Sequence, residues 1–154
     1  MKLAVVGSRT YPLTAEYFAE MPKTQQTEAR KYGKRLVWEY LRPKLKTGDS
    51  VVSGAAKGPD TWGVELARDM QLGVEEIPAD WSKGKGAGFK RNGTIVSRAD
   101  AVVAFWDGVS RGTLDTIKKA HASSKPVCVV FGDPRRIRAN KAWEEMFFKS
   151  PVIE

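Results

Sequence analysis

Three short segments, rich in glycine and small polar residues, each follow an apolar run in this 154-residue chain. They are residues 7–9 (Gly-Ser-Arg), residues 53–55 (Ser-Gly-Ala) and residues 107–113 (Asp-Gly-Val-Ser-Arg-Gly-Thr). An apolar run that leads through such a loop into a helical pattern is typical of a buried parallel strand followed by a helix. Backbone N–H groups and the positive end of the helix dipole then face the loop, an arrangement that binds phosphate. Any one of these segments would also fit an ordinary strand-to-helix turn.

The segment at 107–113 has the fullest set of groups for holding a phosphate. A helical pattern with Leu114, Ile117 and Ala120 follows it. We expect the backbone N–H groups, together with the hydroxyls of Ser110 and Thr113, to hold the phosphate. Asp107 stands at the end of the preceding strand and is the candidate catalytic carboxylate, to orient a water molecule or a ribose hydroxyl. Its structural alternative is capping of the turn.

A basic stretch at residues 80–92 combines three glycines and four cationic residues with two aromatic residues, Trp81 and Phe89. Flexible backbone, cations and stacking surfaces suit a phosphate and a nucleobase. Lys85 or Arg91 would supply the countercharge, and Trp81 or Trp106 would stack on the base. The alternative is a flexible basic loop whose aromatic residues pack inward.

The sequence therefore predicts one pocket for an anionic nucleotide ligand. Its expected lining is Gly7, Ser8, Arg9, Ser53, Gly54, Ala55, Lys85, Arg91, Asn92, Asp107, Ser110, Gly112 and Thr113. Asp60 and Asp80 are further candidate carboxylates, each with a structural alternative in helix-dipole pairing or loop hydrogen bonding. With one histidine and one cysteine, a zinc site is not expected, and no cofactor is implied beyond the nucleotide itself.

The elements that must position these residues alternate between short apolar runs and amphipathic helices. Strands are predicted at 2–7, 50–53, 74–77, 101–105 and 127–131, which gives a single Rossmann-like three-layer α/β domain with a mostly parallel sheet of about five strands. The carboxyl ends of such strands share one edge, where ligands bind. Residues 11–22 are predicted as a loop with one short helical piece, before a helix capped by Thr24 or Thr27. The tail at 133–154 is predicted to be a helix that packs through its aromatic residues.

The composition of the chain indicates which classes of binding partner and which compartment to expect. A formal charge of +8 and a pI near 9.7 favour a nucleotide or nucleic acid, the alternative being a basic surface of no special role. A single cysteine, Cys128, and the lack of an apolar span or a signal-peptide core favour a cytoplasmic protein without membrane association. Five tryptophans and the aromatic tail predict a homodimer or higher oligomer.

Taken together, residues 7–9, 53–60, 84–92 and 99–113 resemble the YspA/YpsA-related branch of the SLOG (Smf/DprA–LOG, Rossmann-like) superfamily, common in bacteria and phages. The resemblance covers about residues 1–130. It implies a Rossmann-like fold of about five parallel strands with a nucleotide-type ligand at their carboxyl ends. Relatives include DprA proteins, which bind single-stranded DNA, and LOG phosphoribohydrolases. One departure is Ala55, where the family usually has a second adjacent glycine.

The resemblance leaves enzymatic activity open. LOG enzymes carry a Pro-Gly-Gly-x-Gly-Thr-x-x-Glu motif, whose glutamate serves cleavage of the N-glycosidic bond. Aligning Gly112 and Thr113 with its Gly-Thr pair puts Thr116 at the glutamate position, and Asp115 lies about 100° around the helix from it. We therefore weigh three functions: a nucleotide-binding protein, an enzyme acting at an N-glycosidic bond, and a DprA-like nucleic-acid binder.

Overall fold

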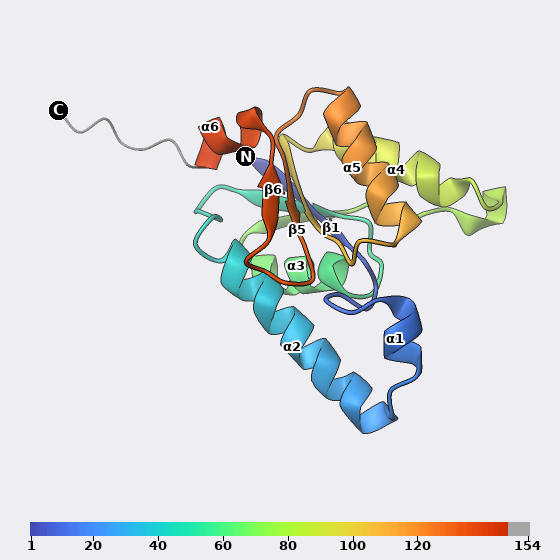
Figure 1. Cartoon of the computed structure of the whole chain (residues 1–154). Coiled ribbons are helices and arrows are strands. Elements are labelled where there is room, and N and C mark those ends of the chain that lie inside the picture. The colour runs from blue at the N-terminus through green and yellow to red at the C-terminus, as the bar shows by residue number, and fades with distance from the viewer. Residues whose placement is uncertain (148–154) are drawn as a thin grey trace.

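The computed structural model describes residues 1–147 and consists of a six-stranded sheet covered by helices on both faces (Figure 1). The strands are β1 (Lys2–Gly7), β2 (Ser50–Ser53), β3 (Gly73–Glu76), β4 (Ala101–Phe105), β5 (Val127–Val130) and β6 (Ile137–Ala139). Their order across the sheet is β3-β2-β1-β4-β5-β6. The five predicted strands are present and parallel, and β6 adds an antiparallel edge beside β5.

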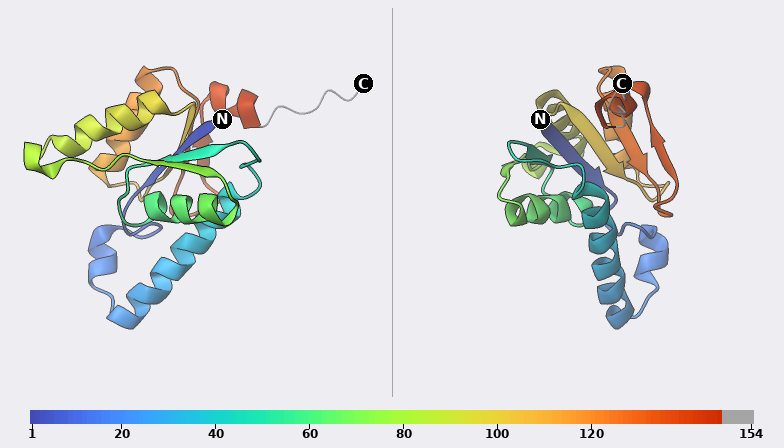
Figure 2. Two further views of the ribbon diagram at one scale, coloured as in Figure 1. Left: turned by 180° about the vertical axis from the view of Figure 1, so that it is seen from behind. Right: turned by 90° about the vertical axis from the view of Figure 1, so that its left-hand side faces the viewer.

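Helices on the two faces complete the three layers, as the two views in Figure 2 show. The helices are α1 (Ala15–Ala19), α2 (Lys23–Leu41), α3 (Pro59–Asp69), α4 (Ala87–Arg98), α5 (Arg111–Ala122) and α6 (Lys141–Phe147), with the short 3₁₀ helix η1 (Trp81–Lys83). Buried residues of α2, α3 and α6 pack in one apolar cluster, and those of α4 and α5 pack in the other.

Strand β1 packs against the helices on both faces of the sheet. Successive side chains of a strand point to opposite faces. Leu3 and Val5 belong to the cluster with α2 and α3, while Ala4 and Val6 belong to the cluster with α4 and α5. All four are buried, which is why the sequence of β1 is a continuous apolar run and does not alternate between apolar and polar residues.

The strand order reverses at β1. From β1 the chain proceeds outward to β2 and β3, then returns to place β4 and β5 on the other side of β1. In an open parallel sheet this reversal leaves a crevice at the carboxyl ends of the two strands on either side of it. Here those strands are β1 and β4, and the loops that follow them are two of the three predicted anion-binding segments.

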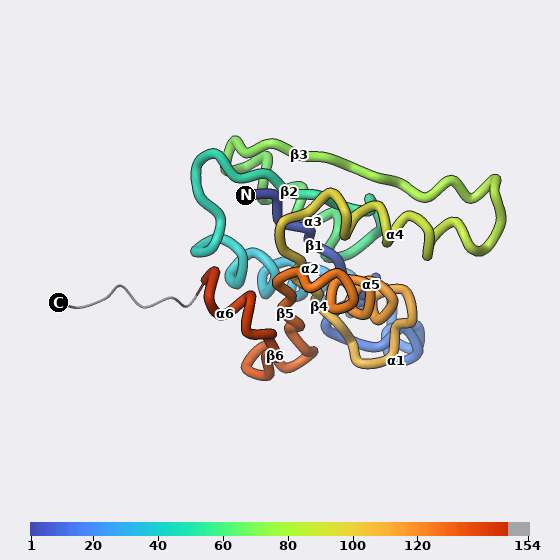
Figure 3. The backbone as a smooth tube through the Cα atoms, turned by 90° about the horizontal axis from the view of Figure 1, so that it is seen from above, coloured from blue at the N-terminus to red at the C-terminus, as the bar shows by residue number. Residues whose placement is uncertain are grey.

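Two segments extend from the carboxyl edge of the sheet. One comprises α1 with the start of α2, and the other comprises η1 with the start of α4, which projects furthest in the view from above (Figure 3). The short helical piece predicted within residues 11–22 is α1. The predicted threonine cap of the next helix is wrong, because α2 begins after Pro22 without a side-chain cap.

The tail differs in part from the prediction. It contains the predicted helix, α6, but also β6, and Trp143 of α6 is completely buried. Phe148, part of the predicted aromatic cluster, lies outside the described residues. Of the five tryptophans, only Trp81 is mostly exposed, at 58%. The tryptophan count therefore gives no separate support to the predicted oligomer, which stays a prediction.

Two helical glycines provide a test of this packing, because replacing them with alanine should change the free energy of unfolding in opposite directions. A Cβ atom on Gly33 of α2 would press on the Tyr11 carbonyl and lie 2.8 Å from Trp62 Cη2, whereas one on Gly93 of α4 would meet nothing within 4 Å. We expect Gly33→Ala to lower the free energy of unfolding by about 1–3 kcal/mol through overpacking. Gly93→Ala should raise it by up to about 1 kcal/mol through helix propensity. Urea denaturation of both variants measures this, and equal effects would contradict the packing described.

Candidate functional site

A cavity of about 620 Å³ opens at the carboxyl edge of the sheet, where β1 and β4 end. Most of the residues predicted to form the ligand pocket line it. They are Gly7, Ser8, Arg9, Lys85, Arg91, Asn92, Asp107, Ser110, Gly112 and Thr113. The two projecting segments form its walls, since residues of the α1 region and of the η1–α4 region contribute to the same lining. The volume lies in the range of pockets that enclose small molecules.

Ser8 connects the two strand ends on the floor of this cavity. Its backbone N–H donates to the Phe105 carbonyl at 3.0 Å, and its hydroxyl accepts from the Asp107 N–H at 3.1 Å. The same hydroxyl lies 3.5 Å from that of Thr113, which in turn lies 3.3 Å from that of Ser110. The hydroxyls of Ser8, just after β1, Ser110, just before α5, and Thr113, within α5, therefore form a polar row at the reversal of strand order.

The amino end of α5 faces this row of hydroxyls. Asp107 Oδ1 accepts from the N–H groups of Val109 and Ser110, at 2.8 and 2.7 Å, and so fixes the turn that leads into the helix. Within the described residues, the N–H groups of positions 111–113 have no hydrogen-bond partner. Gly112 has no side chain to cover them, and a Cβ atom there would meet nothing within 4 Å. Asp107 therefore caps the turn, which was the structural alternative to its catalytic role, and it also lines the cavity.

The predicted residues after β2 lie beside the cavity and do not line it. Ser53 and Gly54 are buried, whereas Ala55 is exposed and has a φ of 60°. The Ser53 hydroxyl donates to the Asp60 carbonyl at 3.0 Å and accepts from the Ala55 N–H at 3.1 Å. Their role in this structure is to shape the loop that holds Asp60, whose side chain does reach the cavity.

Asp60, in the first turn of α3, is the most strongly perturbed carboxyl group of the site. Its residue is only 5% exposed, and Oδ2 accepts from the Gly54 N–H at 3.1 Å. Burial raises the pKa of this carboxyl to about 7, although the Arg91 charge and the N–H groups of Ala56, Gly54 and Gly7 oppose the rise. A buried carboxyl with such a pKa, next to a cavity, is typical of functional sites.

Arg91 is held mainly by backbone carbonyls. Its Nη1 donates to the carbonyls of Gly54 and Ile77, the latter at 3.3 Å, and its Nε donates to Asn92 Oδ1 at 3.2 Å. It therefore ties α4 to the loops that follow β2 and β3. Arg9 and Lys85 are the exposed cations of the lining.

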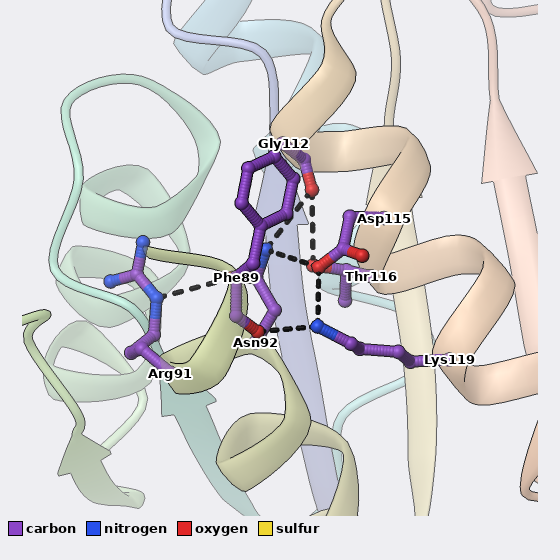
Figure 4. A network of polar contacts seen from close by, with 7 residues as sticks. All are labelled: Phe89, Arg91, Asn92, Gly112, Asp115, Thr116 and Lys119. Carbon is purple, nitrogen blue, oxygen red and sulfur yellow. Dashed lines mark hydrogen bonds and ion pairs between the residues drawn. The ribbon is translucent and has the colours of Figure 1, made fainter. Parts of the chain in front are cut away.

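Asn92 joins the two helices of the cavity wall, as Figure 4 shows. Its Nδ2 donates to the Gly112 carbonyl at 3.2 Å and to Asp115 Oδ2 at 3.1 Å. Lys119 pairs with the same Asp115 oxygen at 2.7 Å and also donates to the Phe89 carbonyl. Asp115 is thereby engaged between α4 and α5, so its carboxylate is committed to this network.

The two candidate stacking residues occupy different positions. Trp81 is mostly exposed and lines the cavity next to Gly88, with Phe89 nearby on the same wall. Trp106 is half-buried, packs on Phe131 and donates from Nε1 to the Ser110 carbonyl at 3.0 Å. Trp81 is therefore placed to meet a ligand, whereas Trp106 supports the loop that precedes α5.

Sequence reasoning missed one wall of the cavity. Thr10, Thr14 and Glu16 line it from the segment around α1, where a loop with one short helical piece had been predicted but no part of the ligand pocket. Thr14 caps α1 by accepting from the Tyr17 N–H at 3.2 Å, and a threonine before a helical stretch is the signal that would have located the start of this helix. Among residues 1–147, no cluster of histidine, cysteine or carboxylate side chains is arranged to hold a metal ion. No helix in that range has the length and apolar character needed to cross a membrane.

Comparison with known proteins places the fold. No family model matches the chain, and no curated protein sequence matches it significantly. Among solved structures, the X-ray structure of TM1055 is similar, with a TM-score of 0.55 and 24% identity over 82% of this chain and 71% of that one. DNA processing protein A from Helicobacter pylori, described by its single-stranded DNA binding mode, is similar with a TM-score of 0.50 and 18% identity over 97% of this chain and 72% of that one. Both likenesses concern the fold.

The buried carboxyl of Asp60 should make folding stability depend on pH in a defined direction. Its pKa is about 7 in the folded chain against 3.8 for the free side chain. As pH rises from about 4 to 7, the unfolded state loses this proton and the folded state keeps it, so the free energy of unfolding falls and then levels off. Each unit of pKa difference corresponds to about 1.4 kcal/mol.

The test compares wild type with Asp60→Asn by urea denaturation between pH 5 and 8. Other titrating groups largely cancel in the difference, and lost hydrogen bonds add only a constant offset. We expect wild type to lose stability relative to the variant as pH rises. Parallel curves would contradict the raised pKa.

Proposed function

We propose that this chain is a nucleotide-binding protein of the SLOG type, with the ligand phosphate held at the carboxyl edge of the sheet. The observation that carries the proposal is the opening of the amino end of α5 into the cavity at the reversal of strand order. Unpartnered N–H groups and a helix dipole at such a position form an anion site. The sequence resemblance to the superfamily and the likeness of fold to DNA processing protein A support the same assignment.

In this proposal, neutral donors hold the phosphate. The N–H groups of residues 111–113 would donate to its oxygens, together with the hydroxyls of Ser8, Ser110 and Thr113. Arg9 and Lys85 would supply countercharge from the two walls, because both line the cavity and are exposed. The nucleobase would extend toward Trp81, whose exposed indole offers a stacking surface.

The site supports binding better than LOG-type hydrolysis. Thr116, at the position of the LOG glutamate, lines the cavity but offers a hydroxyl that donates to the Gly112 carbonyl at 3.3 Å. The neighbouring Asp115 is engaged by Asn92 and Lys119. An N-glycosidic hydrolase built on this chain would need Asp60 or Asp107 as its carboxylate instead.

A DprA-like role with single-stranded nucleic acid is the second candidate. The mouth of the cavity carries the exposed aromatic side chains of Trp81 and Phe89, and three lysines lie at positions 83, 85 and 90. Aromatic stacking combined with a cationic surface is how single strands are bound without sequence preference.

Replacement of Gly112 by valine tests the phosphate site. A Cβ atom at this position meets nothing within 4 Å, and we expect the valine side chain to block a ligand's approach to the N–H groups of the first turn of α5. We expect the variant to stay folded and to lose the thermal stabilisation that a nucleoside 5′-monophosphate gives to wild type, which is about 2.7 kcal/mol at one hundred times the dissociation constant. Gly93→Val is the matched control, because Gly93 is helical, has equally open surroundings and does not line the cavity. Unchanged nucleotide binding by a folded Gly112→Val variant would refute the site.

Salt dependence separates the two candidate functions. The cavity lining carries the cations Arg9, Lys85 and Arg91 but also the carboxyl groups of Glu16, Asp60 and Asp107. Binding of a single nucleotide by neutral donors should therefore weaken little between 50 and 200 mM salt. A protein that neutralises six to ten phosphates of a nucleic acid loses about 10³- to 10⁵-fold over that interval. Fluorescence titrations with a nucleoside monophosphate and with a single-stranded oligonucleotide would distinguish them, and a steep salt dependence for both would favour the nucleic-acid role.

A further inference from the structure

Asn92 of α4 is a buried polar residue of the cavity wall, and its side chain is engaged at both ends, as Figure 4 shows. Its Nδ2 donates to the Gly112 carbonyl at 3.2 Å and to Asp115 Oδ2 at 3.1 Å. Its Oδ1 accepts from Arg91 Nε at 3.2 Å. A guanidinium only donates and an ionised carboxylate only accepts, so these partners determine which end of the amide is oxygen and which is nitrogen.

These bonds leave Asn92 no donor for a ligand. An amide side chain has two N–H groups and two acceptor lone pairs. The two N–H groups are matched by the Gly112 carbonyl and the Asp115 carboxylate. The oxygens of an ionised phosphate accept hydrogen bonds, so Asn92 could bind one only by releasing one of these partners. Its position in the cavity wall therefore does not make it a ligand contact.

The Gly112 carbonyl belongs to the same peptide group as the Thr113 N–H. Because a peptide group is planar, a bond that fixes the direction of its carbonyl also fixes the direction of its N–H. The Thr113 N–H is one of the three at the amino end of α5 that have no partner among residues 1–147. A second side chain, Thr116, donates to the same carbonyl at 3.3 Å. Hydrogen bonds accepted by a carbonyl polarise the peptide group and strengthen its N–H as a donor.

We infer that Asn92 is a positioning residue of the phosphate site, which acts through the peptide group between Gly112 and Thr113 and does not touch the ligand. From α4 it holds the plane of this peptide group, so that the Thr113 N–H is directed at the phosphate. Its donation to the carbonyl also makes that N–H a stronger donor. The inference rests on the proposed binding of a phosphate at the amino end of α5, and it makes the affinity of that site depend on α4.

The other members of the network in Figure 4 keep Asn92 beside Gly112. Lys119 pairs with Asp115 Oδ2 at 2.7 Å, the oxygen that also accepts from Asn92. Lys119 donates in addition to the Phe89 carbonyl, which ties α5 to the first turn of α4. The pairing also offsets the charge of Asp115, which would otherwise repel an anion at the start of the same helix.

The experiment measures dissociation constants of inorganic phosphate and of the four common ribonucleoside 5′-monophosphates for wild type and for Asn92→Ala, at a temperature where both are folded. Every one of these ligands that binds wild type should bind the variant more weakly and by a common factor, about three- to tenfold, as expected for one hydrogen bond. A merely structural role would lower the stability of the variant and leave the affinity of its folded form unchanged.

Asn140→Ala is the matched control. Asn140 is another amide that joins separate elements, since its Nδ2 donates to the Lys125 carbonyl at 2.9 Å and its Oδ1 accepts from the Val127 N–H at 3.1 Å. It lies beside the amino end of β5 and does not line the cavity. Its replacement should lower the free energy of unfolding without changing any of these dissociation constants.

A measurement on wild type decides the matter if Asn92→Ala does not fold. The proton of an N–H group that begins to donate to a phosphate moves downfield in the NMR spectrum. On addition of a ligand that binds, we expect this shift at the Thr113 N–H and not at the side-chain amide of Asn92.

The outcomes separate the inference from the function on which it rests. A folded Asn92→Ala variant with wild-type affinities would overturn the inference and leave the phosphate site standing. A downfield shift that is larger at the Asn92 side chain than at Thr113 would also overturn it, because Asn92 would then be a ligand contact. Absence of binding by inorganic phosphate and by every nucleotide would overturn the proposed function as well.

Discussion

The central position of β1 constrains everything else in this molecule. The strand is buried on both faces and hydrogen-bonded on both edges, to β2 and to β4. Because the chain runs outward from β1 in opposite directions on its two sides, the topology leaves a crevice at the carboxyl ends of β1 and β4. Ser8 closes that end by bonding to the Phe105 carbonyl and to the Asp107 N–H, so the loops after β1 and β4 become one rigid surface. The cavity is the direct consequence of this topology.

Asp60 determines which of the three predicted anion-binding segments has backbone N–H groups left without an internal partner. Its carboxyl group lies among N–H groups from the loops after β1 and β2, namely those of Gly7, Gly54 and Ala56. An internal carboxylate thereby occupies the place that a phosphate would take in those two loops. The loop after β4 has no such internal partner for residues 111–113 in the part of the chain that the structure describes. Three similar sequence segments therefore have unequal roles, and the difference depends on one buried side chain.

The sequence was sufficient for the fold and for much of the cavity lining, because both depend on local signals. Continuous apolar runs predict buried strands, and loops at the ends of parallel strands must meet at one edge. The burial of Asp60 and its place beside the cavity could not be predicted from local signals. An acidic residue in the first turn of a helix is explained by its favourable interaction with the helix dipole, whether or not it has a function. Its environment depends on the Gly54 N–H that donates to it and on the charge of Arg91, which lie 6 and 31 residues away in sequence. Strand β6 was missed because its three residues, Ile-Arg-Ala, carry no pattern that distinguishes an edge strand from a basic loop.

The charges on the surface and those in the cavity have different effects on anions. Surface charge attracts anions at long range, whereas the cavity provides the groups that would contact them. The chain carries a formal charge of +8, but several cations of α2 and α4 are paired with carboxylates, as in Lys34–Glu65 and Arg98–Glu75. The cavity lining contains three cationic and three carboxyl side chains, so it has no large excess of cationic groups. Excess positive charge on the surface raises the local concentration of anions, and salt screens it. The cavity offers oriented N–H groups and hydroxyls instead, whose contribution depends on geometry. A site built in this way discriminates between anions by shape and hydrogen bonding rather than by charge alone, which is what the proposed recognition of one nucleotide among many phosphorylated metabolites would require.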